Sequence, residues 1–490
     1  MLTISEKIHF DCDVLVSGAG PAGSAIAYHL AKMGLRVLVA ESEKFPRDKV
    51  CGDAVSPIAI NELHLMGITS SAIFKKANEI TKVGLFVKND HAIVDLVLPE
   101  ELPYHARIIP RLALDNSIFE NAKKQGAVVM EQTRVLSYTV FPNKVVTKLQ
   151  SGQKPFELVS KILIGADGSR SIVRRILRNE TFDDDFQLIG LRAYYDNVAG
   201  PRERMDVYFT EENFPGIYWF FPEGESGANV GLATLSKTFP YKQQQVKKLL
   251  TDHIAQNKDI RDRINSGSLR DKIEGWPITF YDAQKTVTGN RVMLVGEAAG
   301  LINPLSGDGI QYALLSARWA SEILASCFSD DDFSAEKLYS YKKVLDEQLG
   351  YDLAFSNLIV HFPRNKSLLP VWMKAVETLV ARAKEDQQFG EIIVGISEGT
   401  FPSFKALTFD FVLKILLQGG TMGSDYIMET LKKPSEFRTD GQRFFRTLQK
   451  IFSEMTHEPQ NNLQWMSQIA KKLYHVSQHA VKARNVQSDK

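Results

Sequence analysis

Residues 13–23 read Asp13-Val14-Leu15-Val16-Ser17-Gly18-Ala19-Gly20-Pro21-Ala22-Gly23, a short apolar run followed by G-x-G-x-x-G. Apolar residues then recur at helical spacing over 22–33, and a second apolar stretch, LRVLVAE, occupies 35–41. The order strand, glycine turn, helix, strand is typical of a Rossmann-like α/β domain. In such a turn Gly18 permits the tight bend, Gly20 lets a pyrophosphate approach the backbone, and Gly23 lets helix and strand pack closely.

Two further glycine-rich segments follow at distant places in the chain. Residues 162–174 read ILIGADGSRSIVR, and residues 291–309 read RVMLVGEAAGLINPLSGDG. Each places a short apolar stretch before a glycine-rich turn, as the first segment does. One glycine turn alone is a weak indication, because such turns also occur by chance. The three segments together, in this order, predict bound FAD.

The first segment and its surroundings predict the adenosine side of the site. Pro21 and Ala22 begin a helix whose free N–H groups and positive dipole end face the phosphates. Glu41 closes the second strand, where a carboxylate accepts hydrogen bonds from ribose hydroxyls and disfavours a 2′-phosphate. This site is therefore expected to hold FAD and not NADPH. Arg111 offers a guanidinium to the pyrophosphate or the ring edge, and its alternative is a surface arginine at a helix start.

The other two segments predict the flavin side. Asp167 lies at a strand end, where it can contact the ribityl or phosphate portion and start the next helix. Glu297 is placed to hold a ribityl hydroxyl. Residues 303–309 bring small residues near the isoalloxazine, and the following helix start at Ile310 can stabilise negative charge on reduced flavin. The cofactor-binding residues predicted on these grounds are Gly18, Gly20, Pro21, Ala22, Gly23, Glu41, Arg111, Asp167, Gly168, Gly296, Glu297, Gly307, Gly309 and Ile310.

Composition narrows the class of protein. A chain of 490 residues with a formal net charge of +1 has room for about two to four domains and no bulk field to steer nucleic acid. Its three cysteines, Cys12, Cys51 and Cys327, form no C-x-x-C, so we expect neither a disulfide framework nor a metal or iron–sulfur site. No stretch approaches the roughly 18–20 uncharged apolar residues of a membrane span. We expect a cytoplasmic protein, soluble or peripheral on a membrane, and a monomer or weak homo-oligomer.

The pattern along the chain predicts a discontinuous FAD-binding domain in an α/β protein. Residues 81–98 alternate around a turn like a hairpin, 185–285 are strand-rich and aromatic, and the pattern after Gly307 is helical. A helix is expected over 461–482, and 409–418 (FDFVLKILLQ) is either a packed helix or a segment that dips into a bilayer surface. The predicted FAD-binding domain comprises residues 1–80, 105–182 and 286–345, and the predicted β-rich substrate domain comprises 81–104 and 183–285. A C-terminal helical region is predicted over 346–430, followed by a helical or partly disordered tail over 431–490.

Two further motifs give the chain a family resemblance. Residues 45–53 (FPRDKVCGD) match a P-x-x-x-x-C-G element directly after the ribose carboxylate, and residues 300–310 (GLINPLSGDGI) match G-x-x-N-P-L-[ST]-G-[ED]-G-I. With these residues the chain resembles the geranylgeranyl reductase family, within the flavoproteins similar to p-hydroxybenzoate hydroxylase, over roughly residues 10–420. It departs from the family in three places. Glu297 occupies a position where the family usually has aspartate, and Ile217 replaces the first tyrosine of a Y-x-W-x-F-P element. The tail over 431–490 has no counterpart in the family.

The resemblance implies an activity and a set of reacting groups. In the family NADPH reduces FAD, and the reduced flavin delivers hydride to an isoprenoid C=C while a proton is added at the other carbon. Tyr218 and Trp219 of the aromatic element, together with Cys51, are the catalytic residues it implies, and Cys51 and Gly52 join the cofactor-binding set. Cys51 is equally well interpreted as a small buried residue that packs under the ring. The preference for NADPH over NADH comes from the family alone.

The substrate is expected to be an apolar small molecule or a lipid. Aromatic residues around 218–221 and Trp276 can wall a tunnel for an apolar chain, although each fits an ordinary sheet core as well. The main alternative is an FAD-dependent monooxygenase or halogenase of a small aromatic or carrier-bound natural product. Halogenases carry a W-x-W-x-I-P element that is absent here. Electron transfer to a quinone and a purely structural role for FAD are the remaining alternatives.

Overall fold

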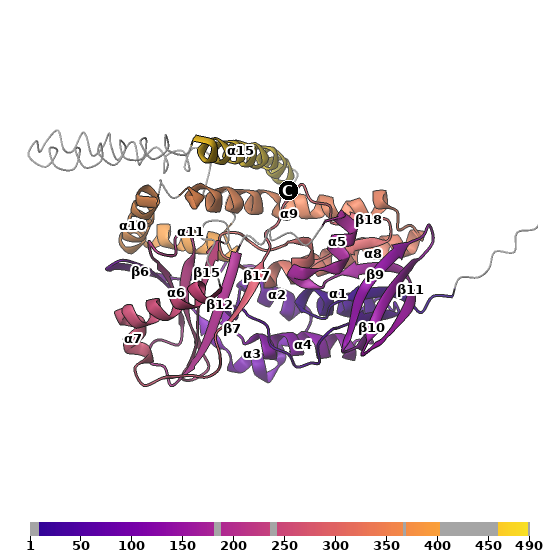
Figure 1. Cartoon of the computed structure of the whole chain (residues 1–490), viewed down its shortest axis with the longest axis horizontal. Coiled ribbons are helices and arrows are strands. Elements are labelled where there is room, and N and C mark those ends of the chain that lie inside the picture. Colours follow the sequence, from indigo (N-terminus) through magenta and orange to yellow (C-terminus); the bar gives the residue numbers. More distant parts are fainter. Residues whose placement is uncertain (1–8, 181–187, 236–242, 366–368, 402–458, 489–490) are drawn as a thin grey trace, which may run out of the picture.

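The computed structural model describes residues 9–180, 188–235, 243–365, 369–401 and 459–488. Two large sheets lie side by side, and a group of C-terminal helices runs across both of them (Figure 1). The functional residues come from both sheets and from these helices, so the arrangement of the three parts decides where the site lies.

The first sheet collects the three glycine-rich segments. Its strand order is β18-β19-β11-β1-β2-β8, with β10 and β9 continuing from β11, and the pairs from β19 to β8 are parallel. The strands are β1 (Cys12–Ser17), β2 (Val37–Ala40), β8 (Val128–Met130), β9 (Thr133–Val140), β10 (Val145–Ser151), β11 (Lys154–Gly165), β18 (Thr288–Gly289) and β19 (Val292–Leu294). Carboxyl ends of parallel strands meet at one edge, so the turns after β1, β11 and β19 come together there.

Helices cover this sheet because its strands are apolar on both faces. Val14, Leu15 and Val16 of β1 are all fully buried. The helices of this part are α1 (Pro21–Lys32), α2 (Pro57–Leu65), α3 (Ala72–Lys76), α4 (Arg111–Lys124), α5 (Ile172–Arg178) and α8 (Ile310–Asp330), with the 3-10 turns η1 (Ile68–Ser70), η2 (Gly168–Arg170) and η3 (Gly296–Ala299). The helices predicted over 22–33 and from Arg111 are thus confirmed.

The second sheet is mostly antiparallel. Its order is β16-β12-β15-β14-β13-β5-β6, β17 also pairs with β12, along Leu188–Arg192, and β13 and β5 form a parallel pair. The strands are β5 (Lys82–Val87), β6 (Asp90–Asp95), β12 (Leu188–Asp196), β13 (Arg204–Phe209), β14 (Ile217–Glu223), β15 (Gly227–Leu235), β16 (Ser268–Leu269) and β17 (Glu274–Ile278). The predicted hairpin is β5–β6. A small sheet of β3 (Ala54–Val55), β7 (Ala106–Ile108) and β4 (Asn78–Ile80) lies between the large ones.

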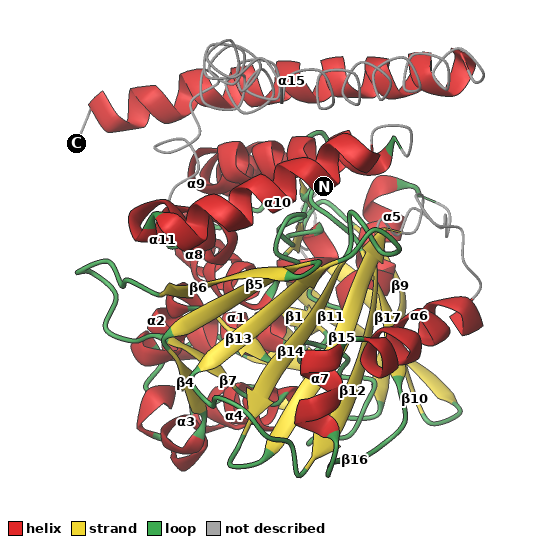
Figure 2. Cartoon of the chain, turned by 90° about the vertical axis from the view of Figure 1, so that its left-hand side faces the viewer, coloured by secondary structure: helices red, strands yellow, loops and turns green. Residues whose placement is uncertain are grey.

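The two faces of the second sheet have different partners. One face packs on α6 (Gln243–Gln256) and α7 (Lys258–Ile264) through a core that includes Tyr218 and Phe220. The other face turns toward α10 (Leu369–Glu385) and α11 (Gln387–Glu398), as the apolar cluster of Val83, Met205 and Met373 shows. Figure 2 shows these helices lying above the strands. The face toward α10 and α11 is the one that borders the site described below.

The C-terminal helices complete the fold. The long helix α9 (Ala335–His361) continues through residue 346, where the sequence predicts a domain boundary, and ends in the 3-10 turn η4 (Phe362–Arg364). Helix α15 (Pro459–Ser488) packs along α9 and includes the helix predicted over 461–482 (Figures 1 and 2). The segment 409–418 lies outside the described residues. Among the described helices, none combines the length and the apolarity that crossing a membrane requires.

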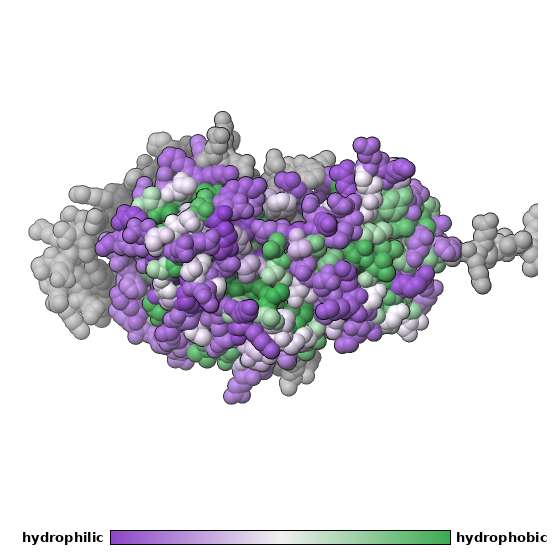
Figure 3. Space-filling model, turned by 90° about the horizontal axis from the view of Figure 1, so that it is seen from below, coloured by the Kyte–Doolittle hydropathy of each residue, from purple (hydrophilic) through white to green (hydrophobic). Residues whose placement is uncertain are grey.

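The predicted fold class is confirmed: an α/β protein with a Rossmann-like domain assembled from distant segments, a β-rich part and a C-terminal helical region. Figure 3 shows one face of the molecule, where hydrophilic residues predominate and apolar residues gather near the middle.

Candidate functional site

One large cavity connects the glycine turns with the C-terminal helices. Its volume is about 1670 Å³, and its wall includes residues of both large sheets and of α9, α10 and α11. Ligand pockets commonly measure about 300–1,000 Å³, so this cavity can hold two molecules in contact. The end beside the glycine turns is polar, and the end beneath α10 and α11 is apolar.

The glycine turns form a backbone cradle at the polar end. A Cβ on Gly18, whose φ is +94°, would lie 2.6 Å from the carbonyl oxygen of Ala166. A Cβ on Gly23 would lie 1.9 Å from the carbonyl oxygen of Gly18, and one on Gly296 would lie 2.6 Å from Cβ of Ala22. These contacts hold the three predicted turns against each other. Gly18, Gly20, Pro21 and Ala22 line the cavity, which is the position that a dinucleotide phosphate requires.

On the adenosine side, Glu41 and Arg111 both reach the cavity wall. Oε2 of Glu41 accepts a hydrogen bond of 2.7 Å from the N–H of Ala19, so the carboxylate is tied to the glycine turn. Arg111 is buried, and two of its nitrogens donate to Asp115 at 2.7 Å each. The bidentate pair fixes the guanidinium and offsets its charge. Arg111 is thus a buried, oriented donor and not a surface side chain.

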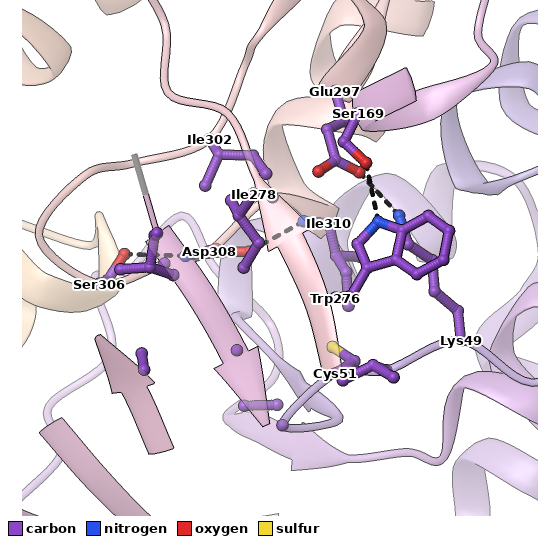
Figure 4. Close-up of a pocket in the computed structure, with 18 of the residues that line it drawn as sticks. Lys49, Cys51, Ser169, Trp276, Ile278, Glu297, Ile302, Ser306, Asp308 and Ile310 are labelled. Atoms are coloured by element: carbon purple, nitrogen blue, oxygen red, sulfur yellow. Dashed lines mark hydrogen bonds and ion pairs between the residues drawn. The ribbon is translucent and has the colours of Figure 1, made fainter. Parts of the chain in front are cut away.

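The flavin side contains a compact group of charged and aromatic side chains. Nζ of Lys49 lies 2.7 Å from Oε2 of Glu297, and Nε1 of Trp276 donates to Oγ of Ser169 at 2.7 Å. Figure 4 shows these four side chains on one wall of the pocket, with Cys51 below them. The ion pair orients the Glu297 carboxylate, which is the group predicted to hold a ribityl hydroxyl.

The second and third turns also place their predicted residues at the cavity. Asp167 lines it, and its Oδ2 accepts the N–H of Ile172 at 2.9 Å, so this carboxylate starts helix α5 as predicted. Gly168 and Gly307 have φ values of +71° each, in the left-handed region that favours glycine. The chain from Gly307 through Gly309 to Ile310 borders the cavity where α8 begins. All the predicted cofactor-binding residues except Gly23 and Gly296 line this one cavity, and those two pack the turns behind it.

Cys51 lies on the cavity wall, and a buried polar network holds its backbone. Nδ2 of Asn229 donates to the carbonyl oxygen of Cys51 and to Oδ2 of Asp53, at 2.8 Å each, and Oδ1 of Asn229 accepts Nε1 of Trp219 at 2.9 Å. The hydroxyl of Tyr194 donates to the same carboxylate oxygen of Asp53. Burial raises the pKa of Asp53 to about 6, and these hydrogen bonds oppose the rise. The network connects the Cys51 turn to strand β14.

Replacing Asn229 by alanine should lower the free energy of unfolding of the flavin-free protein by roughly 3 kcal/mol. The reason is that each buried donor or acceptor left without a hydrogen-bond partner costs about 1–3 kcal/mol. Thermal or denaturant unfolding measures the change. The exposed Asn265 provides the matched control, and its alanine variant should stay within about 0.5 kcal/mol of the parent. An N229A protein as stable as the control would contradict the structural role of the network.

The two aromatic residues proposed as catalytic lie on opposite faces of β14. Trp219 lines the cavity together with Ile217 and Phe221. Tyr218 is buried on the other face, where its ring stacks on His253 of α6 with centroids 3.7 Å apart. Side chains alternate along a strand, so two neighbours cannot both face one cavity. Tyr218 therefore supports the sheet, and we do not include it among the groups that meet a ligand.

The apolar end of the cavity extends beneath the C-terminal helices. Its wall is formed by the second sheet, the end of α9 and one side each of α10 and α11. The apolar residues at this end include Val83, Met205, Phe209, Phe214, Phe362, Trp372, Val376, Leu379 and Ile393. The cavity-facing aromatic residues of β14 lie between the two ends, next to Trp276 on the flavin side. A long apolar molecule can therefore extend from this end to the flavin side.

The sequence analysis did not single out several residues of the site. Lys49 lies within the P-x-x-x-x-C-G element, so its place before Cys51 was a usable signal. Asn229 and Glu398 gave no sequence signal, because a single amide or carboxylate within a strand or helix does not form part of a recognisable motif. Their positions depend on pairing between segments far apart in the sequence.

Comparison with known proteins agrees with the fold and the site. A family described as the FAD binding domain matches residues 11–343. The chain is 30% identical to menaquinone reductase of Mycolicibacterium smegmatis over 64% of this chain and 76% of that protein. It is also 30% identical to digeranylgeranylglycerophospholipid reductase of Methanosarcina acetivorans, over 71% of this chain and 83% of that protein.

Solved structures show the same fold. A geranylgeranyl bacteriochlorophyll reductase-like protein from Thermoplasma acidophilum has a TM-score of 0.68 at 23% identity and covers 79% of this chain and 94% of its own. A flavin-dependent brominase has a TM-score of 0.63 at 18% identity and covers 81% and 96%. The matched domain, the cradle of glycine turns and the two relatives agree. The chain is therefore an FAD-dependent oxidoreductase of the geranylgeranyl reductase family.

Proposed function

We propose that the chain uses NADPH or NADH, through bound FAD, to saturate C=C bonds of a polyprenyl or related apolar substrate. The observation that carries the proposal is the apolar extension of the cavity, which opens directly off the flavin side. Bound FAD would supply the hydride from its N5 once it is reduced. The two reductase relatives are named for menaquinone and digeranylgeranylglycerophospholipid, and both compounds carry polyprenyl chains.

The chain's own residues would bind, orient and desolvate the reactants. The cradle of Gly18, Gly20 and Pro21 would hold the pyrophosphate, and the Glu297 carboxylate, fixed by Lys49, would hold a ribityl hydroxyl. The apolar wall would exclude water and keep an alkene against the ring, which favours reaction by proximity. Cys51 and Trp219 would border the reacting position. An isoprenoid substrate resides in a membrane, so we also propose a peripheral contact with its surface.

Oxygen chemistry is the second candidate, because a flavin-dependent brominase shares the fold. The halogenase element W-x-W-x-I-P is replaced here by residues 217–222, IYWFFP. The apolar wall beneath α10 and α11 also extends away from the flavin side, which suits a long apolar substrate better than a small aromatic one. Both observations favour the reductase.

An anaerobic assay distinguishes the two. FAD-loaded protein, limiting NADPH and a panel of polyprenyl diphosphates, prenylated glycerophospholipids and menaquinones should give flavin reoxidation with two hydrogens gained per saturated bond. Absorbance follows the flavin, and mass spectrometry follows the product. Flavin that stays reduced until oxygen is admitted, followed by hydroxylated or halogenated product, would establish the oxygenase alternative instead.

A further inference from the structure

Two carboxyl groups that the proposed function does not yet use both line the wall of the cavity. Asp308 lies two residues before the first residue of α8, and Glu398 is the last residue of α11. Both line the cavity, and Figure 4 shows Asp308 on the same pocket as Cys51. A Cβ on Gly399 would lie 2.8 Å from Nε2 of Gln311, so the end of α11 abuts the first turn of α8.

Each carboxyl keeps a buried oxygen without a partner among the described residues. Oδ1 of Asp308 accepts the N–H of Ile310 at 2.9 Å, whereas its Oδ2 has no hydrogen-bond partner in the described part of the chain. The same holds for Oε1 of Glu398. A buried carboxyl oxygen without a partner is costly, so each is suited to meet a ligand or to carry a proton.

The helix ends decide which of the two keeps the proton. Asp308 lies at the N-terminus of α8, where the helix dipole stabilises a negative charge. Glu398 lies at the C-terminus of α11, where the dipole disfavours one. Burial, and then the charge of Asp308, raise the pKa of Glu398 to about 8. Burial raises the pKa of Asp308 to about 6, although backbone N–H groups lower it in part.

No cation among the described residues opposes this arrangement. Asp308 is the one charged group acting on Glu398. The polar neighbours at the start of α2 and on α8 are uncharged, and the Ser56 hydroxyl also lowers the pKa of Asp308 in part. Oγ of Ser56 donates to Oε1 of Gln311 at 2.7 Å, and the hydroxyl of Tyr312 accepts from Asn303. Two like carboxyls on one cavity wall titrate as a pair, so at neutral pH the pair holds one proton, which lies on Glu398.

We propose that Glu398, paired with Asp308, is the acid that supplies the proton of the reduction, an inference that rests on the proposed function. The flavin, held by the glycine turns and Glu297, would supply a hydride with its electron pair to one alkene carbon once reduced. Glu398 gives H⁺ to the other carbon and is left as a carboxylate. One C=C π bond is lost and two C–H bonds form, the flavin is oxidised and the alkene is reduced. The carboxylate then regains a proton from water, because it cannot remain charged beside Asp308.

Cys51 is the competing acid, and it is the weaker of the two. Burial raises the pKa of its thiol above the ordinary value, and the nearby Arg111 guanidinium offsets only part of the rise. General acids work best when their pKa is close to the working pH. The Glu398 carboxyl meets this condition, so Cys51 is assigned to the wall of the site and not to proton delivery.

The test uses FAD-loaded E398Q, with E391Q as the matched control. Glu391 lies on the same helix and does not line the cavity. We expect E398Q to bind FAD and to be reduced by NADPH at the parent rate, while anaerobic reoxidation by the isoprenoid slows at least about 100-fold. In the parent this rate should fall as the pH rises through about 8, since protonated Glu398 is required, and E398Q should lose that dependence. C51S should keep the fall in rate with rising pH, and E391Q should behave like the parent.

A second measurement needs no turnover. Infrared spectroscopy of the flavin-free protein at neutral pH should show a protonated carboxyl band that shifts in D₂O, persists in E391Q and is absent from E398Q. If E398Q is reoxidised as fast as the parent, or if it retains the band, the assignment is overturned. If the parent itself is not reoxidised by any isoprenoid, the proposed function fails instead, and the band still reports whether the pair shares a proton.

Discussion

A Gly20→Ala variant should fold like the parent and yet lose most of its FAD. Gly20 has φ −65° and ψ −176°, a backbone conformation that alanine adopts without strain. The nearest protein atom to an added Cβ is Nη2 of Arg47 at 3.5 Å, an ordinary contact. The methyl group would instead occupy the space of the pyrophosphate. We expect the Kd for FAD to rise about 100-fold, or about 2.8 kcal/mol, by titration of flavin-free protein.

Gly23→Ala is the comparison that makes this result specific. A Cβ there would lie 1.9 Å from the carbonyl oxygen of Gly18, which is backbone and cannot move aside. This variant should lower the melting temperature of the flavin-free protein, whereas Gly20→Ala should leave it unchanged. A Gly20→Ala protein with the FAD affinity of the parent would place the pyrophosphate elsewhere.

The residues predicted to bind FAD could be recognised from the sequence because each of them belongs to a short motif. Gly18 and Gly23 are required by close backbone approaches and Gly296 by the nearby Cβ of Ala22, and only glycine avoids these clashes. Such requirements leave a motif at a set spacing, which can be recognised without knowing the fold. The parallel pairing of β1 with β11 and β2 then brings the motifs to one sheet edge.

The apolar end of the cavity and the residues near Cys51 were less predictable, because their positions depend on contacts between segments far apart in the sequence. Tyr218 and Trp219 are neighbours on a strand and face opposite sides, and which side meets the cavity depends on where α6 and α10 pack. Asn229 holds the Cys51 turn through a contact across 178 residues of chain. Glu398 and Asp308 line the same cavity because α11 ends against the start of α8, and nothing in either segment alone indicates that arrangement.

The C-terminal helical region forms one wall of the apolar end of the cavity. The spacing of apolar residues on α10 indicates which side of that helix faces the cavity. Trp372, Ala375, Val376 and Leu379 of α10 line the cavity. Residues three and four apart share one side of a helix, so this spacing presents a continuous stripe to the second sheet. The exposed Lys374 lies off that stripe. Helical spacing thus predicts a buried side on α10, but whether it meets solid core or a cavity depends on the sheet opposite.

An Ala375→Trp variant should therefore retain FAD and lose the reduction of long polyprenyl chains. Ala375 is a small residue on the stripe, and an indole in its place would project into the apolar end of the cavity. The glycine turns lie at the other end, so FAD content and the rate of flavin reduction by NADPH should not change. We expect kcat/KM for a long-chain substrate to fall at least about 100-fold, or about 2.8 kcal/mol, and that for a short-chain analogue to fall less.

Lys374→Trp is the matched control, because it adds the same ring at the neighbouring position on the outer side of α10. Lys374 is 75% exposed and its contact with Glu377 is a surface ion pair, so its loss should cost little. Chain-length discrimination in A375W and parent-like kinetics in K374W would locate the isoprenoid beneath α10 and α11. Equal loss for long and short substrates in A375W would instead show that the ring disturbs the site as a whole. Unchanged reduction of long-chain substrates by A375W would place the substrate outside the apolar end of the cavity. The proposed binding mode would then be wrong even if the reductase activity were established.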